Sequence, residues 1–97
     1  MRFIIPWLRE RDYAQHRDLD PGLPDTYRKW ERMQAREYRR LQQLGEGPVL
    51  PVMVCPIDLE RWADAVQREV DEQARIDFAK ERWAMVRTEN GFEAVTV

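Results

Sequence analysis

The sequence contains no serine, one histidine (His16) and one cysteine (Cys55) among its 97 residues. The absence of serine excludes a Ser/His/Asp triad, and a single cysteine excludes both an internal disulfide and a cysteine-based zinc site. A metal site would have to consist of carboxylates alone, and no glycine-rich phosphate loop is present. We therefore expect no catalytic residues, no metal and no cofactor. The cysteine count also fits a reducing, cytoplasmic setting.

Long hydrophobic runs are missing as well. The apolar stretch at residues 3–8 contains Pro6 and is followed at once by charged residues. It is too short for a membrane span or a signal-peptide core, so we expect a soluble cytoplasmic protein. Hydrophobic residues make up 43% of the chain and charged residues 35%. This balance is typical of a globular chain, and the length predicts one domain with a modest core.

The net charge of −2 hides an asymmetry between the two halves. Residues 1–44 hold ten Arg and Lys against seven Asp and Glu, a net charge of +3. Residues 45–97 hold six against eleven, a net charge of −5. Halves of opposite sign can pair within one fold or between copies of it.

Apolar periodicity and chain breakers predict a single α+β domain covering residues 1–97. The element order indicates a small two- or three-stranded sheet packed against two or three amphipathic helices, with the helices on one face of the sheet. The predicted elements are a strand plus an irregular segment at 1–24, a basic amphipathic helix at 25–44, a strand at 49–55, one helix or two at 58–87, and a strand at 92–97.

The helical region at 58–87 is either one long bent helix or two helices. Asp58 is the expected cap of the helical region 58–87, which contains no glycine or proline. We favour two helices that meet near residues 73–77, because one straight helix would point Trp83 away from Trp62. The strands at 52–55 and 92–97 are expected to form a parallel crossover unit, to which the N-terminal strand adds a third member.

The predicted helix at residues 25–44 is the most informative element, because one of its faces is apolar and the other is basic. One stripe is apolar, and we expect Trp30 on it to meet Trp62 and Trp83 in one core. The opposite face is basic and contains a row of arginines four residues apart, which repel one another on a helix. The bases of this face are Arg28, Lys29, Arg32, Arg36, Arg39 and Arg40.

The segment from Cys55 to Arg61 has the spacing C-x5-R and lies between a predicted strand and a predicted helix. It resembles the phosphate-binding loop of cysteine-dependent phosphatases and related arsenate reductases. That resemblance implies a nucleophilic Cys55 and a phosphate-holding Arg61. The segment departs from the pattern because Pro56 lacks an N–H, Asp58 would repel phosphate, and no glycine is present. We therefore interpret Cys55 as a structural cysteine at a strand end.

The sequence thus predicts a non-enzymatic protein that binds another macromolecule through the basic face of helix 25–44. The expected partner is a protein with an acidic surface, including a second copy of this chain. The alternative is an accessory nucleic-acid-binding protein that uses the same face, although a pI of about 5.4 is unlike that of most such domains. A phosphatase-like enzyme using Cys55 and Arg61 is the distant third hypothesis.

Overall fold

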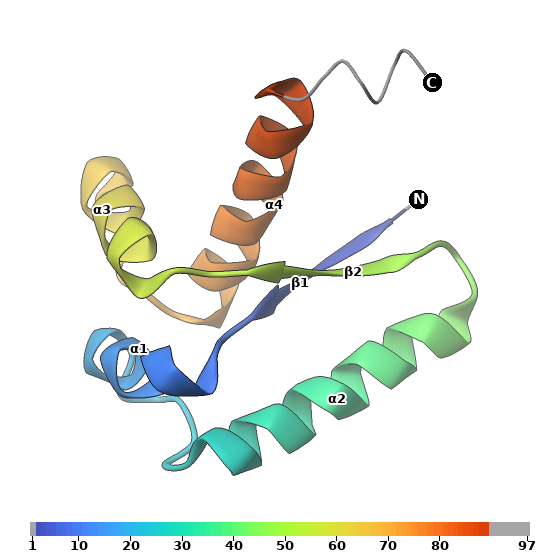
Figure 1. Cartoon of the computed structure of the whole chain (residues 1–97), viewed down its shortest axis with the longest axis horizontal. Helices are drawn as coiled ribbons and strands as arrows, with labels where there is room; N and C mark the ends of the chain where they lie inside the picture. Colours follow the sequence, from blue (N-terminus) through green and yellow to red (C-terminus); the bar gives the residue numbers. More distant parts are fainter. Residues whose placement is uncertain (1, 90–97) are drawn as a thin grey trace.

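The computed structural model describes residues 2–89 and confirms the α+β class. Two strands and a set of helices form one small α+β unit (Figure 1). In chain order the elements are β1 (Phe3–Trp7), the short 3-10 helix η1 (Glu10–Asp12), α1 (Tyr13–Leu19), α2 (Tyr27–Leu44), β2 (Val49–Met53), α3 (Pro56–Val66) and α4 (Glu72–Glu89). The expected strand at 92–97 lies outside the described residues.

The two strands are parallel and directly paired, with Phe3 opposite Val49 and Trp7 opposite Met53. The Phe3 N–H donates to the Pro48 carbonyl, and the Val54 N–H donates to the Trp7 carbonyl, each over 2.9 Å. The N-terminal strand is therefore the immediate partner of the second strand. The chain between them, which includes α1 and α2, forms the long connection that a parallel pair requires.

The register explains how a proline fits into each strand. In a parallel ladder, alternate residues of a strand turn their backbone groups toward the partner. The two bonds above place Phe3, Ile5 and Trp7 in that role on β1. Pro6 and Pro51 therefore fall on the outward-facing positions, where no ladder bond needs their missing N–H. The sequence leaves two interpretations of Pro51, an edge position or a strand that starts at Val52, and the observed β2 from Val49 to Met53 agrees with the first.

Helices cover both faces of the sheet, which corrects the expectation of one covered face. Trp7 packs edge-on against Trp30 of α2, with ring centroids 5.2 Å apart. Arg2 lies on the opposite side, with its guanidinium over the Trp83 ring of α4. Figure 1 shows α2 below the strands and α4 above them. The strands are apolar at nearly every position, as is typical of parallel strands that are buried on both faces.

Helix α2 ends at the predicted residue and begins at Tyr27, two residues inside the predicted range of 25–44. The Thr26 hydroxyl accepts from the Lys29 N–H over 3.2 Å and caps the first turn. Gly45 ends the helix in the left-handed conformation, with φ 66°. A residue with a Cβ is strained in that conformation, whereas glycine adopts it readily. Between these signals, Trp30 is the buried residue of the helix.

The helical region after β2 consists of two helices, and the break lies at residues 67–71, before the predicted position. Gln67 ends α3 in the left-handed conformation, with φ 57°. The Asp71 carboxylate then accepts from the Ala74 N–H over 2.7 Å at the start of α4. The expected cap at Asp58 is wrong, because α3 begins at Pro56 and its N-cap is Cys55. Proline suits this first position since its missing N–H would be unbonded there.

The three helical tryptophans occupy different parts of the interior. Trp30 belongs to the core cluster together with Leu8, Val54 and Phe78. Trp62 packs against this cluster, and its ring centroid lies 5.6 Å from that of Phe78. Trp83 is half-buried beneath the Arg2 guanidinium. Trp30 and Trp62 therefore share one core, whereas Trp83 covers the N-terminal end of the sheet.

A buried ion pair connects the chain after α1 to α4. Arg75 Nη1 lies 2.6 Å from Asp20 Oδ2, with side-chain exposures of 7% and 18%. The other oxygen of Asp20 accepts from the Gly22 N–H over 3.0 Å. Next to this pair, Tyr13 of α1 donates its hydroxyl hydrogen bond to the Pro24 carbonyl. These bonds fix the turn between α1 and α2 against the start of α4.

We expect Trp30→Ala to lower the free energy of unfolding by about 3–5 kcal/mol, because a large buried aromatic leaves a cavity. Urea unfolding followed by far-UV circular dichroism measures the change. Met33→Ala on the same helix is the control, since Met33 is 54% exposed. Equal midpoints for the parent and Trp30→Ala would show that the buried face of α2 is wrongly assigned.

Candidate functional site

The basic face of α2 comprises Arg28, Lys29, Arg32, Arg36, Arg39 and Arg40, all of which are exposed. Two of them have carboxylate partners on the same segment: Lys29 with Asp25 at 3.0 Å and Arg40 with Glu37 at 2.7 Å. Within the described chain, the other four bases take part in no ion pair. These unpaired arginines are Arg28, Arg32, Arg36 and Arg39.

The arrangement of these arginines works against the stability of the helix. Arg28, Arg32 and Arg36 follow one another at a spacing of four, so neighbouring guanidinium groups repel. The first turn of α2 contains Arg28 and Lys29 but no acidic residue. Bases at this position oppose the positive end of the helix dipole. The helix therefore carries this basic face at a cost in local stability.

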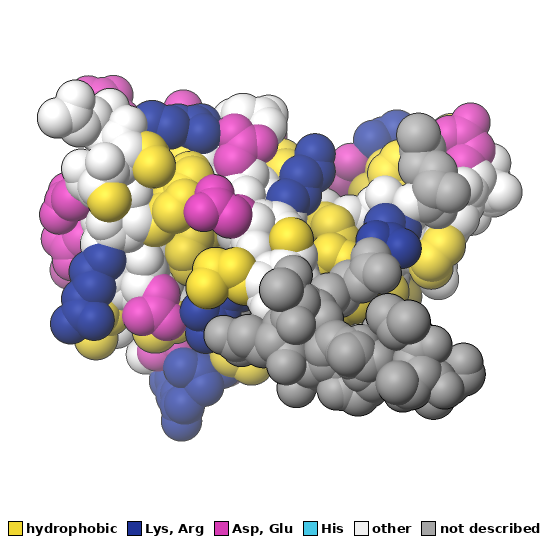
Figure 2. All heavy atoms as spheres, turned by 90° about the horizontal axis from the view of Figure 1, so that it is seen from above, with side chains coloured by type: hydrophobic (Ala, Val, Ile, Leu, Met, Phe, Trp, Pro, Cys, Tyr) yellow, Lys and Arg dark blue, Asp and Glu magenta, His cyan; other side chains and the backbone are white. Residues whose placement is uncertain are grey.

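The acidic half of the chain does not neutralise this face. Among the described residues, the one ion pair that joins residues 1–44 to residues 45–97 is Asp20–Arg75. That pair uses an acid from the basic half and a base from the acidic half. On the face that carries α3 and α4, Figure 2 shows acidic and basic side chains interspersed with hydrophobic ones.

A groove of about 450 Å³ borders the basic face between α2 and the two strands. The aromatic side chains of Trp7 and Tyr38 contribute to its wall, and Arg39 belongs both to the groove and to the basic face. We call this site the α2–β2 groove, and it is lined by Trp7, Ala35, Tyr38, Arg39, Gln42 and Pro51. Tyr38 lies on the predicted helix 25–44, but nothing in the sequence links it to Trp7 or Pro51.

The segment from Cys55 to Arg61 does not form a phosphate loop. Helix α3 begins at Pro56, so the residues between Cys55 and Arg61 are helical. The Leu59 N–H donates back to the Cys55 carbonyl over 2.9 Å, as in an ordinary first turn. A phosphate loop instead needs several free amides that converge on the anion. Arg61 is exposed on the helix, and the geometry removes the basis of the resemblance to cysteine-dependent phosphatases.

His16 is buried in the core, although its neighbours in sequence, Arg17 and Asp18, are charged. Its Nε2 lies 3.2 Å from the Val54 carbonyl oxygen. Because a carbonyl only accepts, Nε2 must carry the proton of the neutral ring. Burial lowers the pKa of His16 below its ordinary value, and the nearby Arg75 lowers it further. His16 therefore connects α1 to the end of β2 in its neutral form.

Residues 2–89 offer neither a metal site nor a membrane-spanning helix. No group of His, Cys, Asp and Glu side chains in this part of the chain could hold a metal ion. None of the described helices has the length and apolar character needed to cross a membrane. No family model, no curated protein and no solved structure matches the chain. The basic face and the α2–β2 groove are therefore the features from which a function is argued.

The neutral His16 predicts a pH dependence of stability. The pKa is about 6.5 in an unfolded chain and lower in the folded protein. The unfolded state therefore binds more protons between these two pKa values, and stability falls as the pH drops below about 6.5. Urea midpoints measured from pH 8 downward test this, with His16→Gln as the comparison. If both proteins have the same slope in this window, His16 does not titrate as described.

Proposed function

We propose that this protein is a binding module that docks an acidic protein surface on the outer face of α2 and in the α2–β2 groove. The unpaired arginines Arg28, Arg32, Arg36 and Arg39 supply the charge, and the groove receives an apolar or aromatic side chain of the partner. A reducing, cytoplasmic setting is part of the proposal and is supported by the free Cys55.

The observation that carries the proposal is the difference between the bases of one helix. Lys29 and Arg40 have carboxylate partners within four residues, whereas the four unpaired arginines have none in the described chain. Arginine presents a planar array of donors that matches carboxylates in a two-pronged geometry. Such groups, exposed and unpaired on a rigid helix, are suited to the carboxylates of a partner.

The groove distinguishes a protein partner from duplex nucleic acid. Protein interfaces centre on buried aromatic and arginine anchors inside a polar rim. The α2–β2 groove offers such a centre, because Trp7 and Tyr38 lie beside Arg39. Duplex binding depends mainly on phosphate contacts and requires no apolar pocket. The groove and the arginines together therefore favour a protein.

Selection from a random-peptide display library tests the proposal directly. We expect the wild-type protein to enrich peptides that combine several Asp or Glu residues with an aromatic residue. The variant with Arg28, Arg32, Arg36 and Arg39 changed to glutamine should lose this enrichment. The matched control changes the paired bases Lys29 and Arg40 to glutamine and should retain it. Enrichment without acidic residues, or equal enrichment by both variants, would contradict the proposal.

Nucleic-acid binding is tested in parallel with a labelled random duplex and a random single strand. We expect no affinity tighter than about micromolar at physiological salt, the tight end of ordinary non-specific binding. Contact with about four phosphates would give a log–log salt slope near −3.6. Sub-micromolar binding that has this slope and is lost in the four-glutamine variant would show that the partner is a nucleic acid and not a protein.

Self-association remains to be distinguished from binding to a different protein. Light scattering at low and high salt gives the molar mass of the protein in solution. A dimer that dissociates at high salt and in the four-glutamine variant would identify a second copy as the acidic partner. A monomer at both salt concentrations would show that the partner is a different protein. The peptide selection then indicates the residues that this partner presents.

A further inference from the structure

The outer edge of β1 carries backbone groups that do not face β2. The register turns Phe3 and Ile5 toward β2, so the N–H and C=O of Ile4, which lies between them, point the other way. At the end of the strand, the outward carbonyl of Pro6 accepts from the Gln34 side chain of α2 over 2.8 Å. Residues 2–89 place no such partner on the outward groups of Ile4, which can therefore bond to another strand.

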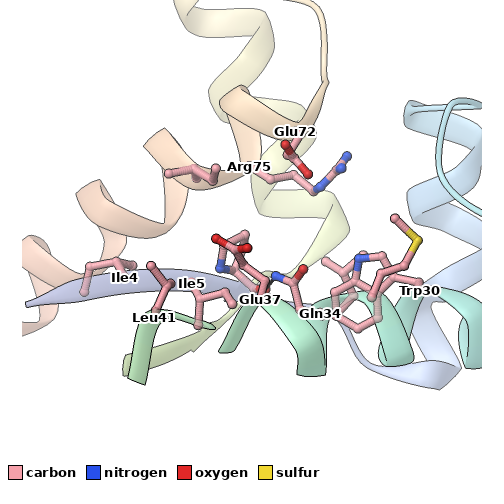
Figure 3. Close-up of a pocket in the computed structure, with 12 residues that line it drawn as sticks. Ile4, Ile5, Trp30, Gln34, Glu37, Leu41, Glu72 and Arg75 are labelled. Carbon is pink, nitrogen blue, oxygen red and sulfur yellow. Dashed lines mark hydrogen bonds between the residues drawn. The ribbon is translucent and has the colours of Figure 1, made fainter. Parts of the chain in front are cut away.

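This edge opens into a groove of about 300 Å³ between α2 and α4, which we call the β1-edge groove. Figure 3 shows Ile4 and Ile5 on the strand, Leu41 and Gln34 rising from α2, and Arg75 descending from α4. The two helices stand on opposite faces of the sheet, and both line the groove. An extended segment beside β1 would thus have a helix over each face, as β1 itself has. The volume is at the small end of ligand pockets and suits a short segment.

The same geometry disfavours a second copy of this chain in the groove. The β1 edge of that copy would lie between its own α2 and α4, so the helices of the two copies would meet before the strands could pair. A peptide segment without flanking helices avoids this clash. Such a segment can join an exposed sheet edge as a further strand, with main-chain hydrogen bonds providing affinity and side-chain pockets providing specificity.

The charge of the groove indicates what the segment carries. Two carboxylates line it, Glu37 of α2 and Glu72 of α4. Glu37 is bonded to Arg40, whereas Glu72 forms no ion pair with the described residues. Arg75, the base among the lining residues, is already paired with Asp20. Glu72 therefore remains to be neutralised, and a lysine or arginine of the segment has the complementary charge.

We infer that the β1-edge groove binds an extended peptide segment of a partner protein, rich in β-forming apolar residues and carrying one lysine or arginine. Alternate side chains of this strand would face α2 and α4, where Leu41 and Ile76 offer apolar contacts and Glu72 offers a charge. The site is separate from the proposed surface for an acidic partner, since none of the unpaired arginines of α2 lines this groove. The two surfaces would select segments of opposite charge.

Peptide display on the four-glutamine variant tests the inference without the basic face of α2. We expect random heptapeptides enriched on this bait to combine β-forming apolar residues with one lysine or arginine. Because the unpaired arginines are absent, the result does not depend on the proposed function. No enrichment, or enrichment of acidic peptides, would overturn the inference.

Two variants of the wild-type chain test the role of Glu72 with the selected peptide. Glu72→Gln should weaken binding by about two- to fivefold, the effect of losing one exposed ion pair. Glu69→Gln removes the same charge from an exposed residue outside the groove and should leave the affinity unchanged. Fluorescence anisotropy of the labelled peptide measures both. Equal affinities of the two variants would overturn the assignment to this groove.

N-methylation of the selected peptide tests strand addition on the wild-type chain. A strand beside β1 directs only alternate N–H groups toward it. Of two peptides methylated at odd or at even positions, one should bind at least about tenfold more weakly, because its bonding N–H groups are lost. The other should bind as before. Equal effects of the two methylation patterns would contradict a strand on β1.

Hydrogen exchange locates the peptide on the full chain. The Ile5 N–H faces β2 and serves as the internal control. The Ile4 amide should exchange rapidly in the free protein and at least about tenfold more slowly with saturating peptide, because a bonded amide must open before it exchanges. An unchanged Ile4 amide would overturn the inference. Protection of Ile4 without peptide would also overturn it, and its loss on dilution would identify a second copy as the occupant.

Discussion

The buried contact between Asp20 and Arg75 is the one ion pair of the described residues that joins the two halves of this small protein. The pair spans 55 residues of sequence, and both side chains are largely shielded from water. Removing a charge from water is costly, so each member of such a pair depends on the other. Asp20 also accepts a hydrogen bond in the turn that leads into α2, and Arg75 lies at the start of α4, where it lines a groove of about 300 Å³ between α2 and α4. One interaction thus joins the turn before α2 to the start of α4.

This arrangement has a consequence for the surface. The pair uses an acid of the basic half and a base of the acidic half. The remaining residues of the basic half are therefore more positive, and those of the acidic half more negative, than each half as a whole. The remaining described ion pairs are formed within a half. Helix α2 therefore keeps four arginines without a carboxylate partner in the described chain, on the side opposite its buried Trp30. The proposed function starts from this imbalance, since an acidic partner would supply what the fold does not.

The sequence predicted the features that depend on local signals. The predicted range 25–44 agrees to within two residues with α2, which Thr26 and Gly45 bound, and the apolar period placed Trp30 on its buried face. Features made by distant segments could not be read in this way. Nothing near Phe3 or Val49 indicates that the two strands pair directly, and the α2–β2 groove combines Trp7, Tyr38 and Pro51 from three elements. The end of α3 at Gln67 was also missed, because a left-handed residue other than glycine leaves little trace in the sequence.

A double-mutant cycle on Asp20 and Arg75 tests the central claim most directly. Asp20→Asn removes the charge and keeps an oxygen for Gly22, and Arg75→Met keeps an apolar stem of similar length. Breaking a buried pair from one side costs about 3–5 kcal/mol, so we predict that Asp20→Asn, which leaves the Arg75 charge buried alone, loses about this much in urea unfolding. The double variant should be much more stable than the sum of the two single losses implies. Strictly additive losses would contradict the account, because they would show that Asp20 and Arg75 stabilise the fold independently of each other.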